Sequence, residues 1–186
     1  MVDRRSFLTS SALVAAAIRE MPLMADESQT KEGGVLHQLP DFKKGCRLLF
    51  QGDSITDMKW GRNEKDRNHY LGHSYVYLLA SRLGVEMPEV NLDFYNRGMS
   101  GHKIADLKSR WQKDAVDMQP DVLSILIGIN DVSRGGGKQV PIEPWERDYR
   151  FILDLSHKVN SDLKLVLLDP CVLRSGRLAN ETSWKR

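Results

Sequence analysis

The sequence predicts an α/β domain built on a doubly wound, parallel sheet. Short apolar runs alternate along the chain with longer segments whose apolar residues recur every three or four positions. This alternation is typical of βαβ units, in which a helix returns the chain to the next parallel strand. The run at 122–127 is almost wholly apolar, as expected for a parallel strand covered on both faces.

The same patterns place the individual elements. Strands are predicted at 47–51, 92–95, 122–127 and 163–168. Helices are predicted between them at 72–83, 103–116 and 143–159. Gly84 is expected to end the first helix, because glycine commonly follows the last helical residue. The inward residues are expected to be Val76, Leu79, Ala80 and Leu83, then Ile104, Leu107, Trp111 and Ala115, then Phe151, Leu155 and Val159.

Composition excludes some classes of function. The chain has 186 residues, which suits one domain, with 41% hydrophobic and 28% charged residues and a formal charge of +2. No basic stripe interleaved with aromatic residues indicates a nucleic-acid partner. No apolar stretch is long enough for a membrane span. We assign residues 46–186 to the folded domain and residues 26–45 to a polar lead-in.

Residues 1–25 resemble an export signal. Arg4 and Arg5 precede Ser-Phe-Leu and a short apolar stretch, and Met24-Ala25 offers a cleavage site. The paired arginines are similar to the twin-arginine class of signals, which predicts a periplasmic or extracellular protein. An amphipathic N-terminal helix is the alternative interpretation. Export would permit disulfides, but Cys46 enters the first strand and Cys171 leaves the last. These ends lie roughly 15 Å or more apart, so we expect two free thiols.

Polar residues follow three predicted strands where each strand ends. Gly52-Asp53-Ser54 follows the first, Asn96 to Gly101 follows the second, and Gly128-Ile129-Asn130-Asp131 follows the third. Reactive crevices of open α/β sheets lie outside these carboxyl ends. Ser54 is therefore a candidate nucleophile. The alternative is that Asp53 and Ser54 only cap the next helix.

Together these residues suit acyl transfer. Attack of Ser54 on an ester carbonyl creates a negative oxygen that needs preorganised donors. The backbone N–H groups of Ser54 and Gly101 and the side-chain amide of Asn130 are the candidate donors. Glycine at 101 allows a close backbone approach. Asp53 is expected to orient the turn, with Gly52 and Asp131 in supporting positions.

This pattern resembles the SGNH hydrolases, the GDSL-type esterases and lipases. Gly52 to Thr56 looks like the first block of the family, Asn96 to Gly101 like the second, and Gly128 to Asp131 like the third. The resemblance implies a flavodoxin-like, three-layer fold with strand order 2-1-3-4-5. It also implies hydrolysis of an ester, such as an acetylated sugar or a small acyl ester, with no metal or organic cofactor.

The fourth block of the family, Asp-x-x-His after a fifth strand, has no counterpart after residue 168. The general base is therefore unassigned, and His102 is the nearest histidine by sequence. The fifth strand and last helix are expected to be missing, so the domain is incomplete and its activity impaired. The fourth strand would then be an exposed apolar edge prone to self-association.

Other signals are weaker. A non-catalytic module that binds a carbohydrate or ester in the same pocket is the alternative function. A flavodoxin-like nucleotide-binding domain would fit the sheet, but the glycine-rich fingerprint after the first strand is absent. Arg134 to Lys138 lacks the Ser or Thr of a phosphate loop. The loop from Trp60 to Arg67 is expected to be a solvated loop, and Trp111 and Trp145 to be core residues.

Overall fold

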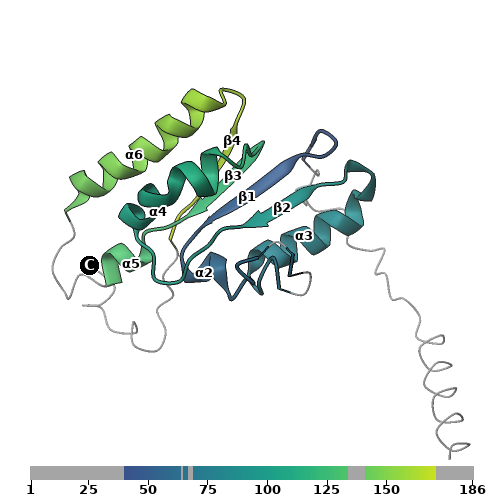
Figure 1. The fold of residues 1–186 in the computed structure, drawn as a ribbon, viewed down its shortest axis with the longest axis horizontal. Coiled ribbons are helices and arrows are strands. Elements are labelled where there is room, and N and C mark those ends of the chain that lie inside the picture. Colours follow the sequence, from purple (N-terminus) through teal and green to yellow (C-terminus); the bar gives the residue numbers. More distant parts are fainter. Residues whose placement is uncertain (1–39, 64, 67–68, 134–140, 171–186) are drawn as a thin grey trace, which may run out of the picture. The chain divides into compact units, whose positions relative to one another are not determined.

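The computed structural model describes residues 40–63, 65–66, 69–133 and 141–170. Its four-stranded parallel sheet has the order β2-β1-β3-β4 (Figure 1). The strands are β1 (Arg47–Gly52), β2 (Asp93–Asn96), β3 (Val122–Leu126) and β4 (Lys164–Leu168). The predicted fold class and strand order are confirmed. The export signal and most of the lead-in lie outside the described residues.

Helices cover both faces of the sheet (Figure 1). On one face, α3 (Tyr75–Glu86) packs with alternate residues of β1, among them Leu48 and Phe50. On the other face, α4 (Ile104–Trp111) and α6 (Ile142–Val159) cover Leu49 and the inner residues of β3. Two short helices, α2 (Ser54–Asp57) and α5 (Ile129–Ser133), follow directly on β1 and β3. Burial on both faces explains the almost wholly apolar strand pattern.

The helix α3 departs from the prediction at its end. It continues through Gly84 to Glu86, and Met87 leaves the helical conformation before Pro88. Proline disfavours helical geometry in the residue before it, and this outweighs the glycine signal. A 3₁₀ turn, Pro88–Val90, follows. Leu79, predicted to face inward, is 40% exposed, whereas Val76 is fully buried.

The buried face of α6 also differs from the prediction. Phe151 and Val159 are exposed and Leu155 is partly buried, while Asp148, Ile152 and Ser156 are buried. The buried face of α6 is shifted by one position from the predicted face, because the polar residues Asp148 and Ser156 make the contact with α4. Trp111 Nε1 donates to Ser156 Oγ at 2.9 Å, and Lys108 Nζ donates to Asp148 at 2.7 Å. A pattern search that counts only apolar residues misses such a face.

Other predictions for the core are confirmed. Ile104, Leu107, Trp111 and Ala115 are all buried, and the helical segment ends in a π turn, Gln112–Val116. Trp145, also expected in the core, is only partly buried; it packs against this cluster and stacks on Tyr149. Cys46 is a buried free thiol, and Cys171 lies outside the described residues. Among the described residues, no helix is long and apolar enough to cross a membrane.

Candidate active site

The carboxyl ends of β1, β2 and β3 meet at one edge of the sheet. Phe50 of β1 pairs with Asn96 of β2, and Gly52 of β1 pairs with Leu126 of β3. This register brings the segments that follow β1, β2 and β3 to the same edge. The three polar segments singled out in the sequence therefore belong to one region of the fold.

Ser54 is the first residue of α2. Asp53 caps this helix, because its Oδ1 accepts a hydrogen bond from the Ile55 N–H at 2.9 Å. Burial raises the pKa of Asp53, whose Oδ2 is buried with no partner among the described residues. Ser54 itself is exposed. Asp53 therefore caps α2, and Ser54, the next residue, faces solvent.

The segment after β2 packs directly on α2. A Cβ on Gly98 would lie 2.8 Å from the Cα of Asp57 and collide with backbone. On the β1 side, a Cβ on Gly52 would collide with the Leu126 carbonyl oxygen. Glycine is needed at both positions for close approach. The Met99 N–H also donates to the Gly52 carbonyl at 3.0 Å.

Asp57 joins α2 to the second segment. Its side chain is 1% exposed and accepts hydrogen bonds from the Ser100 N–H (2.8 Å) and the Ser100 hydroxyl (2.6 Å). Arg62 donates to both carboxylate oxygens, at 2.8 and 2.6 Å. Burial opposes ionisation, but these hydrogen bonds outweigh it and hold the pKa of Asp57 below its ordinary value. The carboxylate therefore fixes the chain one residue before Gly101.

Asn96 ties the same region together from the end of β2. Its buried amide donates to the carbonyls of Thr56 (2.7 Å) and Leu71 (2.8 Å). Its Oδ1 accepts from the Gly98 N–H at 2.9 Å. Every one of these partners is backbone, so Asn96 sets the path of the chain around α2.

Asn130 and Asp131 hold the other end of the second segment. The Asn130 amide donates to the His102 carbonyl at 3.0 Å, and Asp131 Oδ1 accepts from the Ile104 N–H at 3.3 Å. Burial raises the pKa of Asp131, whose Oδ2 has no partner among the described residues. Gly101, just before His102, has a φ of 85°, in the left-handed region that favours glycine. The predicted donors Gly101 and Asn130 are therefore brought together.

The bonding of His102 does not suit a general base. Its Nδ1 accepts from Arg110 Nε at 3.3 Å, which places the proton of the neutral ring on Nε2. Burial lowers the pKa of His102, and the charge of Arg110 acts in the same direction. In neutral His102, Nε2 carries the proton and Nδ1 already accepts a hydrogen bond, so neither ring nitrogen is available to accept a proton from Ser54.

Two Asp-x-x-His spacings occur elsewhere in the described chain. His69 Nδ1 lies 3.4 Å from Asp66 Oδ2 in the loop after α2, and the His69 ring meets His73 edge to face. Asp154 and His157 are exposed near the end of α6, which leads into the amino end of β4. Because β4 is parallel to the other strands, the second pair lies at the edge of the sheet opposite Ser54.

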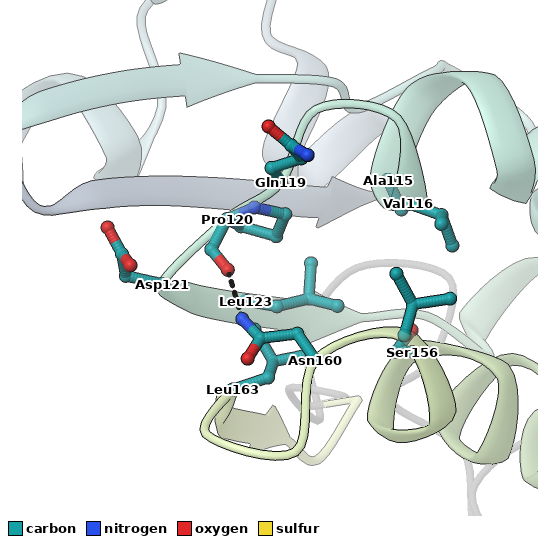
Figure 2. A pocket seen from close by; sticks show the side chains of 10 residues that line it. Ala115, Val116, Gln119, Pro120, Asp121, Leu123, Ser156, Asn160 and Leu163 are labelled. Carbon is teal, nitrogen blue, oxygen red and sulfur yellow. Dashed lines mark hydrogen bonds between the residues drawn. The ribbon is translucent and has the colours of Figure 1, made fainter.

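A cavity of about 280 Å³ lies at that opposite edge, between the π turn and the end of α6 (Figure 2). Figure 2 shows the Asn160 amide donating to the Pro120 carbonyl across it, at 3.2 Å. Its lining is mostly apolar, and it holds none of the candidate catalytic residues. Within the described part of the chain, no cluster of His, Cys, Asp or Glu could hold a metal ion.

Sequence reasoning missed the residues that hold the site together. Asp57 was not among the predicted site residues, yet it is buried in α2. Trp60 was expected in a solvated loop, but it is buried and its Nε1 donates to the Gly98 carbonyl at 2.7 Å. The available sequence signal was the polar segment that contains Asp57 and Trp60. A polar segment does not indicate that these residues bond to Ser100 and Gly98, about 40 positions away. Arg67 and the segment from Arg134 to Lys138 lie outside the described residues.

Comparisons with known proteins agree on one family. Residues 50–186 match the model of the GDSL-like lipase/acylhydrolase family. A curated acetylxylan esterase of Geobacillus stearothermophilus is 44% identical over 91 residues, which is 48% of this chain and 42% of that protein. The chain therefore spans less than half the length of this curated relative.

Solved structures give the same result. A protein described as a GDSL-like lipase from Parabacteroides merdae matches with a TM-score of 0.71 and 37% identity, over 77% of this chain and 68% of that one. The Geobacillus acetylxylan esterase Axe2 matches with a TM-score of 0.60 and 35% identity, over 66% and 59%. Other matching structures are catalytic mutants of Axe2 with a serine, an aspartate or a histidine replaced by alanine.

Proposed function

Because the chain belongs to the GDSL-like lipase/acylhydrolase family, we propose that it is a serine ester hydrolase with Ser54 as its nucleophile. The observation that carries this proposal is that hydrogen bonds from α2 and α5 hold the segment around Gly101 on both sides. Asp57 of α2 holds Ser100 on one side, and Asn130 and Asp131 of α5 hold residues 102 and 104 on the other. A preorganised donor site requires this kind of rigid support.

The reaction follows from these roles. The Ser54 oxygen attacks the ester carbonyl and loses its proton to a base, and the carbonyl oxygen becomes negative. The N–H groups of Ser54 and Gly101 and the Asn130 amide stabilise that charge. Collapse of the intermediate expels the alcohol, which takes up the proton, and leaves an acyl group on Ser54. Water then attacks the acyl-enzyme, releases the acid and restores the serine.

The proposed substrate is an acylated carbohydrate, with a small acyl group such as acetyl. The similarity to an acetylxylan esterase supports this choice. The catalytic mutants of that relative replace a serine and a histidine, which supports a serine nucleophile working with a histidine base in the family.

In a polypeptide of these 186 residues, we infer slow turnover. All five histidines precede β4, at positions 37, 69, 73, 102 and 157. His102 is engaged by Arg110, and His157 lies at the opposite edge of the sheet. Removal of the histidine from a catalytic triad lowers turnover by a factor on the order of 10⁶. The oxyanion donors and substrate binding still accelerate the reaction by roughly 10³–10⁴ over water.

Hydrolysis of p-nitrophenyl acetate tests this function. We expect slow turnover above the uncatalysed rate that falls in Ser54→Ala and is unchanged in Ser109→Ala, an exposed serine on α4. Turnover as fast as that of the Geobacillus esterase would contradict the inferred impairment. No turnover, with an acetylated xylo-oligosaccharide still bound, would favour the alternative of a non-catalytic binding module.

Export is a separate proposal, supported by Arg4, Arg5 and the apolar stretch that follows. Fusion of residues 1–30 to a reporter that works only outside the cytoplasm tests it. We expect export that is lost when both arginines become lysine. A reporter that stays in the cytoplasm with the natural arginines would contradict the proposal.

A further inference from the structure

The cavity of about 280 Å³ at the edge of the sheet opposite Ser54 has no role in the proposed reaction (Figure 2). Its walls come from the π turn, from β3 and from the end of α6. Protein interiors contain few voids larger than a water molecule, and an engineered cavity of about 150 Å³ in another protein is already large enough to bind benzene. The size of this cavity is therefore the first sign of a site for a small molecule.

Two departures from regular backbone geometry shape one side of the cavity. Helix α4 widens into the π turn, which is closed by a hydrogen bond of 2.8 Å from the Asp117 N–H to the Gln112 carbonyl. The last two residues of this turn, Ala115 and Val116, line the cavity. Gln119 also lines it and has a φ of 50°, in the left-handed region that residues other than glycine rarely adopt. Both kinds of irregularity occur often at functional sites.

Hydrogen bonds hold the walls of the cavity in place. Asn160, which follows α6, donates to the Pro120 carbonyl at 3.2 Å, and its Oδ1 accepts from the Asp162 N–H at 3.1 Å. The Gln119 N–H donates to the Val116 carbonyl at 3.1 Å. Because these walls are fixed before a ligand enters, binding costs little ordering of the protein.

The hydroxyl and the carboxylate of the lining already have partners inside the protein. The buried Ser156 hydroxyl accepts from Trp111 Nε1 at 2.9 Å and donates to a carbonyl one turn earlier in α6 at 2.7 Å. The Asp121 carboxylate accepts from the Arg47 N–H at 2.8 Å and pairs with Lys43. A charged ligand would lose its hydration in the cavity without gaining a free partner of opposite charge. The lining therefore favours an uncharged ligand.

The rest of the lining is mainly apolar and consists of Ala115, Val116, Pro120, Leu123, Val159 and Leu163. We propose that this cavity binds a small, uncharged, apolar molecule of about the size of indole, at a site separate from that for the ester. Removal of apolar surface of the ligand and of the cavity from water drives this binding. None of the lining residues belongs to the proposed acyl-transfer site, so the proposal does not depend on the esterase function.

Titrations of the full chain, followed by methyl NMR, test this binding. The probes are indole, benzoate and benzylamine, which are similar in size and are respectively neutral, anionic and cationic at neutral pH. We expect indole to bind about tenfold or more tightly than either charged probe, with an affinity that changes little as NaCl is raised. Equal binding of the three probes, or no binding of indole, would overturn the proposal.

A charge placed at the mouth of the cavity locates the site. Val159 lines the cavity and is 57% exposed at the end of α6, so Val159→Asp should keep the fold and weaken indole binding about tenfold. The matched control is Val85→Asp, at an exposed valine of α3 outside the cavity lining, which should leave the affinity unchanged. We also expect nuclear Overhauser effects between indole and the methyl groups of Ala115 and Val116. Indole binding that Val159→Asp does not alter, or Overhauser effects only to other methyl groups, would show that the cavity is not the site.

Discussion

The side-chain amide of Asn130 donates to the main-chain carbonyl of His102 at 3.0 Å. This bond joins the segment after β3 to the segment after β2, one residue beyond Gly101. An amide has two N–H groups, so Asn130 can hold the loop with one and face a substrate oxygen with the other. Asn130 thereby has both an anchoring role and a proposed catalytic one.

Replacing Asn130 by alanine removes both roles. We expect the rate of p-nitrophenyl acetate hydrolysis to fall about 100-fold, as for other oxyanion donors, with a larger effect on kcat than on KM. The matched control is Asn160→Ala, which loses a similar amide-to-carbonyl bond at the opposite edge of the sheet. Steady-state kinetics of both variants checks the prediction. Equal losses in the two variants would show that Asn130 is only structural.

The close packing of Gly98 on α2 predicts opposite effects for two glycine variants. Gly98→Ala introduces a Cβ that collides with the backbone of Asp57, so we expect the free energy of unfolding to fall by about 1–3 kcal/mol. Gly84→Ala meets no atom within 4 Å inside α3, so it should raise stability by about 0.5–1 kcal/mol. Urea denaturation measures both, and a harmless Gly98→Ala would refute the packing argument.

The low pKa of Asp57 predicts a specific dependence of stability on pH. Its folded pKa lies below the unfolded value, so its contribution is complete above about pH 4 and is lost as the pH falls through the folded pKa. Asp57→Asn should therefore lower the free energy of unfolding by about 3 kcal/mol near pH 7, and the difference should shrink in acid. Asp154→Asn, an exposed position on α6, is the control. A difference independent of pH would argue against an ionised Asp57.

The edge strand β4 carries a prediction about assembly. Val166, Leu167 and Leu168 are exposed, with Leu167 at 50%, and an apolar edge strand can pair with a second copy. We predict self-association that Leu167→Lys reduces. Leu78→Lys on α3, at a leucine that is even more exposed (67%), should not reduce it. Sedimentation velocity distinguishes these outcomes, and a natural chain that stays monomeric would contradict the predicted self-association.

The sequence predicted the parts of this fold that local patterns encode. Strand ends at Gly52, Asn96 and Gly128 were recognisable because apolar runs stop there, and parallel topology then places Ser54, Gly101 and Asn130 at one edge. The pairing of Asp57 with Ser100 was not predictable, because the two are 43 positions apart and a buried carboxylate has no periodic signature. The face of α6 was misplaced for a related reason, since Ser156 and Asp148 make polar contacts inside the helix interface.

Covalent labelling by a fluorophosphonate tests the central claim most directly, because this probe phosphonylates a serine nucleophile, slowly where a base is missing, and its polarised phosphoryl oxygen takes the place of the negative oxygen of the acyl-transfer intermediate. We predict that peptide mapping by mass spectrometry places the adduct on Ser54, that Ser54→Ala is not labelled, and that Asn130→Ala is labelled more slowly than Asn160→Ala. Labelling spread over several serines, or at a rate that Asn130→Ala does not change, would contradict the assignment of Ser54 and Asn130 to one acyl-transfer site.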